Sequence, residues 1–363
     1  MKNYKFKVLS PIEDGEFTKM IGMSNSIFLA GPCPREDFSS DWRYEAFDIL
    51  EELDFTGTVI TPTNEQFKEF EKGKSLTKNE MRKKQVDWER RMMYSCSALV
   101  FWVPRDGEHP ARTTNIEFGE WYKKPGVFFG WPDNAIHNEY FECKLDEQQK
   151  YKTNDLRVLL ASVVDYLNRD EIRYFTSDTH FCQKRTLELS RRPFVDVLDM
   201  DLNMMSNWNK NITNNDIVYH AGDFMDIDQI KLLPELLSNL NFKELHWTLG
   251  NYDRKVVDRI KELVNDKVLN GRKVFFYENG ECRVEIDGQK YVIKHEPDDF
   301  EVGIKDGEIA LYGHIHGRAF AKLNGFDLGV DYHQYSPISE EQVKWFTNAM
   351  KYWDNNVYCN KVR

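Results

Sequence analysis

Short apolar runs alternate with longer amphipathic segments along most of this chain, and this alternation limits the folds that it can adopt. In the first half, apolar runs that end at or just before proline are followed by segments whose apolar residues recur at helical spacing. Strands that alternate with helices pair in parallel, and the helices cover both faces of the sheet. We therefore expect strands over 27–30, 58–60, 98–103 and 127–129, with helices over 42–53, over 81–94 and from about 114.

A helical apolar stretch over 156–167 ends in a polar segment, after which the alternation starts again with a strand over 173–176. The remaining strands are expected over 217–219, 245–247, 274–276, 291–293 and 309–311. We place a boundary between the two series and predict an α/β protein with domains over 1–168 and 169–363. For the first domain we expect a flavodoxin- or Rossmann-like parallel sheet, with its first clear strand at 27–30.

Composition narrows the class of protein. A chain of 363 residues that is 41% hydrophobic has enough apolar surface for two globular domains. Its net charge of -11 argues against general nucleic-acid binding, which needs a basic face, without excluding it. The six cysteines are scattered, as expected for reduced thiols. No run approaches the roughly 18 apolar residues of a membrane span. We expect a cytoplasmic protein that does not bind a membrane, in the host cytoplasm if the chain is viral.

Polar residues that commonly bind metals follow the apolar runs of the second half. They are Asp178, His180, Asp223, Asn251, His295, His314 and His316. Two divalent ions about 3.5–4 Å apart can clamp the attacking and leaving oxygens of a phosphoester. Such a pair needs a bridging carboxylate together with oxygen and imidazole ligands. One such segment arises often by chance. Five in this order, at 178–180, 223, 251, 295 and 314–316, predict a dinuclear metal site and phosphoester hydrolysis.

These patches resemble those of the calcineurin-like metallophosphoesterase family over about Arg173 to Ser339, and most of all its small phage and bacterial branch. The resemblance implies a four-layer α/β/β/α sandwich that holds two divalent ions, with Mn²⁺ expected first and Fe, Zn, Ni or Mg as alternatives. It implies one metal on Asp178, His180 and His316, and the other on Asn251, His295 and His314. Asp223 would bridge them.

The chain departs from this family at one position. Many members have a histidine after the Gly-Asn pair, where it assists the leaving group, and this chain has Tyr252. A tyrosine with an ordinary pKa near 10 is a weaker acid at neutral pH. We therefore consider Tyr252 and His220 as the proton donors of this site, and expect substrates with good leaving groups.

In the first half, the candidate residues lie after predicted strands and in the helices that follow them. Because these ends meet along one edge of a parallel sheet, the side chains could converge there. Thr113 and Thr114 would cap a helix whose free N–H groups hold a phosphate or sugar oxygen. Glu117 would lie in the first turn of that helix, where a carboxylate can attack an anomeric carbon. The helix dipole alone also favours a glutamate there, and Glu89 could belong to a solvated helix face.

The stretch from Ile27 to about Tyr140 resembles the nucleoside 2-deoxyribosyltransferase-like family. The matching segments are 27–32 with Arg35, 41–43, 57–59, 88–89, 101–105 and 113–119. The resemblance implies Glu117 as the nucleophile and Glu89 as a carboxylate that positions substrate, with Asp87 as the fallback. The candidate substrate-binding residues are Gly31, Pro32, Arg35, Arg105, Arg112, Thr113, Thr114 and Asn115.

The chain also departs from this second family. Better-known transferases have an aspartate six residues before the nucleophile, where this chain has Ala111 followed by Arg112. An arginine beside the pocket suits a phosphate, which suggests a nucleoside 5′-monophosphate as substrate. The alternative is that Arg112 pairs with a surface glutamate. With water as the acceptor, the same site would be an N-glycoside hydrolase.

Together these features predict a bifunctional nucleotide-processing enzyme that acts on small nucleosides, nucleotides or phosphoesters. The resemblance to the transferases implies a homo-oligomer. In the alternative interpretation, the first domain only binds or senses a nucleotide, and the second is a phosphodiesterase or nuclease.

Overall fold

The computed structural model describes residues 3–11, 23–33, 41–62, 77–107, 110–297, 307–318, 321–322 and 325–351. The chain divides into two compact units. The N-terminal unit comprises Met1–Arg169 with the short segments Asn209–Asn214 and Asn239–Asn241. The C-terminal unit comprises Asp170–Trp208, Asn215–Ser238 and Phe242–Arg363.

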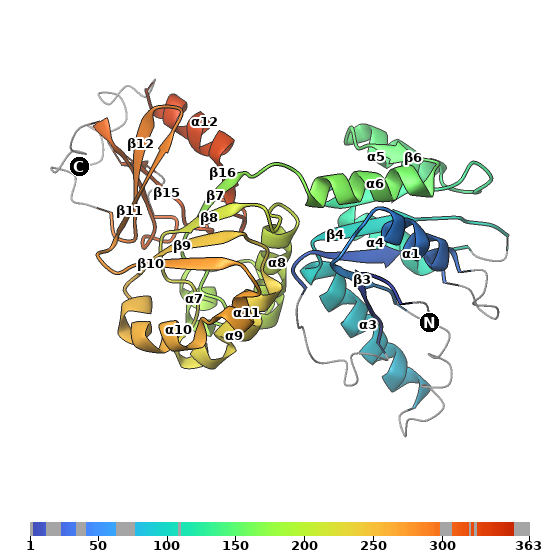
Figure 1. Ribbon diagram of the computed structural model, residues 1–363, viewed down its shortest axis with the longest axis horizontal. Coiled ribbons are helices and arrows are strands. Elements are labelled where there is room, and N and C mark those ends of the chain that lie inside the picture. The colour runs from blue at the N-terminus through green and yellow to red at the C-terminus, as the bar shows by residue number, and fades with distance from the viewer. Residues whose placement is uncertain are drawn as a thin grey trace. The chain divides into compact units, whose positions relative to one another are not determined.

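The N-terminal unit is built on a six-stranded sheet (Figure 1). Its strands are β1 (Lys7–Leu9), β2 (Ser26–Ala30), β3 (Thr58–Ile60), β4 (Ala98–Trp102), β5 (Val127–Gly130) and β6 (Lys152–Thr153). The order is β1-β3-β2-β4-β5-β6, and every pair is parallel. The predicted parallel α/β sheet is confirmed. Without β1 the order is that of flavodoxin-like sheets, in which the connections reverse direction between β2 and β4.

Helices cover both faces of this sheet. They are α1 (Trp42–Glu52), α3 (Lys78–Ser95), α4 (Arg112–Trp121), α5 (Glu139–Glu147) and α6 (Leu156–Leu167). The apolar stripe of α6 packs with α1 and one face of the central strands in a single core cluster. On the other face, Phe118 of α4 packs against Phe129 of β5 and Phe141 of α5.

The sequence analysis missed β1, because an edge strand of three residues is too short to show a period.

The C-terminal unit contains two five-stranded sheets. The first has the order β10-β9-β8-β7-β16, from β7 (Arg173–Thr176), β8 (Ile217–His220), β9 (Glu244–Thr248), β10 (Lys273–Tyr277) and β16 (Ile338–Ser339). Its first four strands are parallel. The second has the order β11-β12-β13-β15-β14, from β11 (Glu281–Ile286), β12 (Gln289–Lys294), β13 (Ile309–Tyr312), β14 (Ala321–Lys322) and β15 (Gly325–Asp327).

The two sheets of this unit share one core. Phe175 and Tyr219 of the first sheet cluster with Ile293 and Leu311 of the second, and α12 (Glu340–Lys351) adds Val343. The other helices are α7 (Lys184–Leu189), α8 (Val197–Asn209), α9 (Leu233–Asn239), α10 (Val257–Leu263) and α11 (Asp266–Leu269), with 3-10 turns η2 (Ile227–Leu232) and η3 (Asp253–Val256). The four-layer metallophosphoesterase sandwich stays a prediction.

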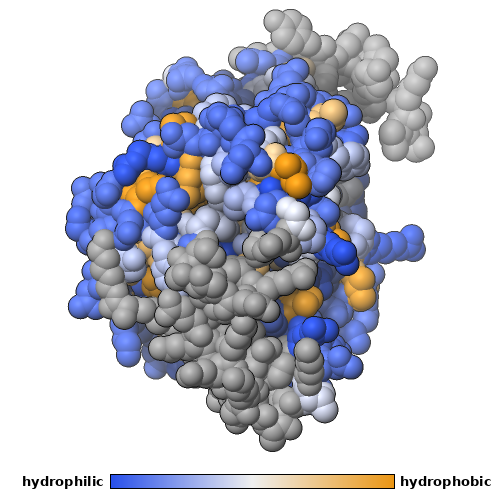
Figure 2. Space-filling view, turned by 90° about the vertical axis from the view of Figure 1, so that its right-hand side faces the viewer, coloured by the Kyte–Doolittle hydropathy of each residue, from blue (hydrophilic) through white to orange (hydrophobic). Residues whose placement is uncertain are grey.

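The surface and the thiols complete this description. The face shown in Figure 2 is mainly hydrophilic, with its apolar residues in separate small areas. None of the helices in the described ranges has the length and apolar character to cross a membrane. The five cysteines within those ranges are free thiols.

Candidate active sites

A cavity of about 520 Å³ lies at the carboxyl end of β2 in the N-terminal unit, between α3 and the start of α4. This is where the strand order reverses, which is the usual ligand position in an open α/β sheet. The cavity brings together seven of the predicted residues: Gly31, Pro32, Glu89, Arg112, Thr113, Thr114 and Glu117. The predicted Arg35 lies outside the described residues.

Two carboxyl groups face this cavity from different helices, Glu89 from α3 and Glu117 from α4. Burial raises the pKa of Glu89 to about 7, and the nearby charge of Glu117 adds to the effect. Burial also raises the pKa of Glu117 to about 7, although the Arg43 guanidinium acts in the opposite direction. Because repulsion between two carboxylates is mutual, their protons leave in two coupled steps. Ionisation of Glu117 therefore favours the protonated form of Glu89.

The α3 helix presents Glu89 rather than Asp87 to the cavity. Its residues that line the wall are Arg82, Gln85, Val86 and Glu89, which follow the spacing of one helix face. Gln85 Nε2 donates a hydrogen bond to Glu89 Oε1 at 2.8 Å. Asp87 is exposed and does not line the cavity. The geometry therefore favours Glu89 as the second carboxyl group.

The start of α4 corrects two details of the sequence analysis. The helix begins at Arg112 after Ala111, whose φ of 48° and ψ of 48° are left-handed, and no side chain caps it. Thr113 and Thr114 are thus inside the helix and are not its cap, and Glu117 lies in its second turn. An uncapped helix start leaves N–H groups without partners in the helix, beside a cavity that Arg112 also lines.

Arg105 and Asn115 were predicted to bind substrate, but the structure uses their polar groups internally. Arg105 donates to Asn115 Oδ1 at 2.6 Å and to the His137 carbonyl at 2.9 Å. Its guanidinium also lies 4.8 Å from the centre of the Phe141 ring. Neither residue lines the cavity. Their role is to hold α4 against the chain that follows β4.

The sequence analysis assigned no role to Arg43, which binds backbone carbonyls beside the cavity. This buried side chain donates to the carbonyls of Leu29 at 3.1 Å, Gly31 at 2.9 Å and Pro32 at 3.3 Å, and pairs with Asp41 at 3.0 Å. Gly31 has φ +148°, and a Cβ there would lie 2.1 Å from the Trp102 carbonyl oxygen. Only glycine fits this turn, and Arg43 fixes its carbonyls.

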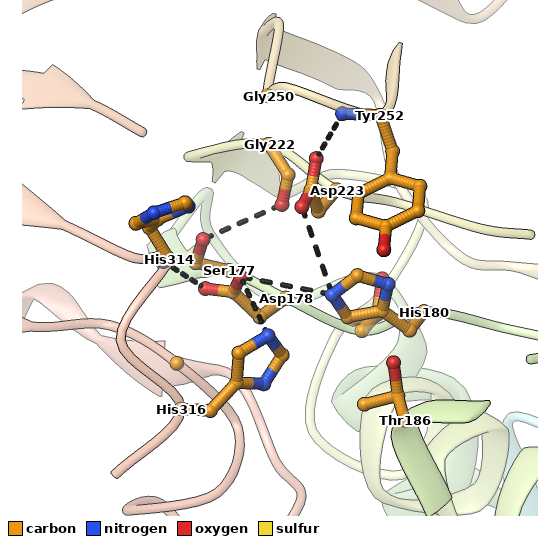
Figure 3. A network of polar contacts seen from close by, with 12 residues as sticks. Ser177, Asp178, His180, Thr186, Gly222, Asp223, Gly250, Tyr252, His314 and His316 are labelled. Atoms are coloured by element: carbon orange, nitrogen blue, oxygen red, sulfur yellow. Dashed lines mark hydrogen bonds and ion pairs between the residues drawn. The ribbon is translucent and has the colours of Figure 1, made fainter. Parts of the chain in front are cut away.

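In the C-terminal unit, the predicted metal ligands converge from the ends of β7, β8, β9, β12 and β13. Figure 3 shows Asp178, His180, Asp223, His314 and His316 close together. Two groups have ligand atoms within 4.8 Å of one another, one of Asp178, His180 and His316, the other of Asp178, Asp223 and His295. His180 Nε2 lies 3.8 Å from Asp178 Oδ1 and 3.7 Å from Asp223 Oδ2. His295 Nε2 lies 3.3 Å from the same Asp223 oxygen. Asp223 therefore reaches both groups.

The surroundings of His295 fit a cation. Its Nδ1 lies 2.9 Å from the Ala221 carbonyl and so carries a proton. Its Nε2 then faces Asn251 Oδ1 at 2.9 Å, His314 Nδ1 at 3.2 Å and Asp223 Oδ2 at 3.3 Å. Burial opposes protonation of this ring, but the bond to Asp223 and the nearby carboxylates raise the pKa of His295 to about 9. These inward-facing atoms need a proton or a metal ion among them.

The ligand group of Asp178, His180 and His316 also has buried polar atoms without hydrogen-bond partners in the described ranges. Asp178 Oδ1 and both ring nitrogens of His180 are buried without a hydrogen-bond partner among the described residues. Leaving buried polar atoms unpaired is costly, so this donor set of carboxylate and imidazole fits a divalent ion.

The backbone of the site is strained. Five of the seven predicted ligands have positive φ: Asp178 (55°), His180 (48°), Asp223 (57°), His314 (74°) and His316 (46°). Each such residue costs free energy that the surrounding structure must offset, and strain of this kind gathers at functional sites.

A buried arginine holds the strained turn. Arg192 donates to the carbonyls of Asp178 at 2.7 Å and Thr179 at 2.9 Å, and pairs with Asp331 at 2.9 and 3.0 Å. Asp331 Oδ2 in turn lies 3.2 Å from His316 Nδ1, which fixes the ring with Nε2 toward Asp178. The sequence analysis gave neither residue a role.

His220 does not suit the proton-donor role considered for it. The side chain is fully buried, its Nδ1 accepts from the Gly222 N–H at 3.1 Å, and its Nε2 lies 3.0 Å from Thr179 Oγ1. Burial, together with His295, lowers the pKa of His220 to about 3. Tyr252 is better placed, with its ring 5.5 Å from that of His180 and its N–H donating to Asp223 Oδ1 at 2.9 Å.

Comparison with known proteins finds similarity over part of the chain. A family model described as "Nucleoside 2-deoxyribosyltransferase like" matches residues 24–134. The chain is 28% identical over 178 residues to the uncharacterized protein MJ1445 of Methanocaldococcus jannaschii, across 47% of this chain and 88% of that protein. It also aligns with a protein of unknown function, AQ665 from Aquifex aeolicus, with TM-score 0.39 and 18% identity, across 49% of this chain and 100% of the other. The resemblance to metallophosphoesterases stays a prediction. Residues 24–134 are therefore similar to the nucleoside 2-deoxyribosyltransferase-like family.

Proposed function

We propose that this chain is a bifunctional nucleotide-processing enzyme, which breaks or exchanges an N-glycosidic bond in its N-terminal unit and hydrolyses a phosphoester in its C-terminal unit. The first activity is supported by the two carboxyl groups that share one cavity in a nucleoside 2-deoxyribosyltransferase-like domain. The second is supported by the convergence of buried carboxylate, amide and imidazole ligands.

In the N-terminal unit, the Glu117 carboxylate attacks the anomeric carbon of the sugar. A C–O ester bond forms while the bond from this carbon to the base nitrogen breaks, and its electron pair leaves with the base, which takes up a proton. Water or a second base then attacks the same carbon and releases Glu117. Glu89 retains a proton beside the ionised Glu117 and offers a hydrogen-bond donor to the substrate.

The start of α4 supports a nucleoside 5′-monophosphate as the substrate. Its uncapped N–H groups and the exposed Arg112 provide positive charge at one end of the cavity, where a phosphate fits.

In the C-terminal unit, one divalent ion would be held by Asp178, His180 and His316. A second would be held by Asn251, His295 and His314. Asp223 would bind both ions. When bound, the ions would supply the charge that activates water and stabilises the transition state of phosphoester hydrolysis. The chain's own contribution is to hold these ligands in place, through Arg192, Asp331 and the carbonyl of Ala221.

Separate measurements test the two activities. Base release from a panel of nucleosides and 5′-monophosphates, followed by chromatography, should disappear in Glu117→Gln. If the wild type releases no base and transfers none to a second base, the first unit only binds a nucleotide. For the second unit, the bound Mn²⁺ is counted by elemental analysis and hydrolysis of p-nitrophenyl phosphate is followed. Fewer than two ions per chain, or hydrolysis that survives EDTA, would contradict the dinuclear site.

A further inference from the structure

Two cationic side chains flank Tyr252 at the metal-ligand cluster. An Arg185 guanidinium nitrogen (Nη1), from α7, lies 2.6 Å from the Tyr252 hydroxyl oxygen. The Lys255 ammonium lies 4.5 Å from the centre of the Tyr252 ring. Both cations are exposed, and within the described ranges neither forms an ion pair with a carboxylate. By contrast, neighbouring Lys184 pairs with Glu188 and Arg254 pairs with Glu296.

The hydrogen bond between Arg185 and Tyr252 determines whether the Tyr252 hydroxyl acts as a donor or an acceptor. An arginine has only donors, so the guanidinium donates and the phenol oxygen accepts. The proton of the Tyr252 hydroxyl is then free to be donated elsewhere. Because the Tyr252 N–H binds Asp223 and its ring meets the His180 ring edge-on, the phenol is anchored to the ligand cluster from two directions.

Uncompensated cations beside the cluster favour an anion. A guanidinium has five N–H donors, and Arg185 uses one of them on Tyr252, so others remain for phosphate oxygens. A phosphomonoester carries close to two negative charges at neutral pH, because its second pKa is about 6. A phosphodiester carries one negative charge. Two free cations therefore match the monoester better.

We propose that Arg185 and Tyr252 form the leaving-group side of the phosphoesterase site and select a phosphomonoester. Arg185 binds a non-bridging phosphate oxygen, and Tyr252 donates a hydrogen bond to the leaving oxygen. Lys255 adds positive charge behind the phenol. This inference rests on the proposed metal-dependent activity of the C-terminal unit.

The test compares Arg185→Gln with Lys184→Gln, which removes one positive charge from the adjacent position of the same helix. Each Mn²⁺-loaded full-length protein is assayed with p-nitrophenyl phosphate and bis(p-nitrophenyl) phosphate. Inorganic phosphate binding is measured separately by calorimetry. We expect Arg185→Gln to raise KM for the monoester and weaken phosphate binding roughly 10- to 100-fold, as for loss of a charge-assisted hydrogen bond. The diester should change less, and Lys184→Gln should match the wild type.

Tyr252→Phe, which keeps the ring, should mainly lower kcat, and its effect should not add to that of Arg185→Gln if the two side chains act together. Equal results for Arg185→Gln and Lys184→Gln, in a wild type that binds Mn²⁺ and hydrolyses the monoester, would overturn this inference alone. So would a wild-type preference for the diester. A wild type that binds no Mn²⁺ would overturn the proposed phosphoesterase and this inference with it.

Discussion

The two candidate sites lie at similar places in their sheets but satisfy their buried polar groups differently. In the N-terminal cavity, Gln85 donates a hydrogen bond to Glu89, and burial raises the pKa of both carboxyl groups, which favours their protonated forms. In the C-terminal cluster, Asp178 Oδ1 and His180 have buried atoms without partners in the described ranges. The second site thus has ligand atoms that a divalent ion would balance. In our proposal, this difference corresponds to two separate chemistries within one chain.

The largest effect should come from removing the nucleophile. Glu117→Gln keeps the size of the side chain but cannot attack a carbon, so base release should fall more than about 10³-fold. Phosphate release should not change, because Glu117 belongs to the other site. Both products are measured in the same reaction. If Glu117→Gln lost both activities with its fold intact, the separation of the two sites would be wrong.

The reciprocal change is Asp178→Asn. Because Asp178 belongs to both ligand groups, its loss should reduce Mn²⁺ content to below one ion per chain and abolish phosphate release. Base release should persist. Elemental analysis gives the metal content, and unchanged content would show that Asp178 is not a ligand.

A smaller effect is expected from Asp331→Asn, which weakens the partner that orients His316. Losing such a partner typically lowers metal affinity about 10- to 100-fold. Calorimetric titration with Mn²⁺ measures it, and Asp287→Asn, at an exposed ion pair with Lys344, is the matched control. Equal affinities for the two variants would exclude an orienting role for Asp331.

The pH profile of base release tests the coupling between the two carboxyl groups. Since Glu117 must be ionised to attack, activity should rise as pH increases through about 7. Because Glu89 keeps its proton while Glu117 ionises, Glu89→Gln should leave this acid limb in place and should remove the fall in activity at higher pH that ionisation of Glu89 causes. A fall in activity at higher pH that persists unchanged in Glu89→Gln would mean that the proton of Glu89 has no part in base release.

The smallest effect concerns stability. Burial raises the pKa of Glu117 above its ordinary value of 4.5, so ionisation in the folded state costs stability as pH rises from about 4.5 through 7. Glu117→Gln removes this cost and should raise the Tm by about 2–4 °C at pH 8. At pH 4 the carboxyl is largely protonated in both states, so the variant should melt with the wild type. A Tm difference of the same size at both pH values would indicate another cause.

Short sequence motifs predicted the residues of the two sites better than the residues that hold those sites in place. The metal-ligand candidates were predicted because they follow apolar strands, and strand ends come together in a parallel sheet. Glu117 was predicted from its place in the helix after the strand over 98–103 and from the resemblance to the transferases. The residues that hold the site residues in place could not be predicted from the sequence. Arg192 and Asp331 are 139 residues apart, and nothing local distinguishes a buried arginine such as Arg43 from a solvated one. The start of α4 was misplaced because Ala111 adopts a left-handed conformation without glycine.

The central claim, two independent active sites, is tested most directly by a crossed assay of one substrate set. The wild type, Glu117→Gln and Asp178→Asn are incubated with nucleosides and 5′-monophosphates, with Mn²⁺ or with EDTA, and free base and free phosphate are measured separately. We expect base release that survives EDTA and Asp178→Asn but is lost in Glu117→Gln, and phosphate release with the opposite pattern. Loss of both products in either variant, or base release that requires Mn²⁺, would contradict two independent sites.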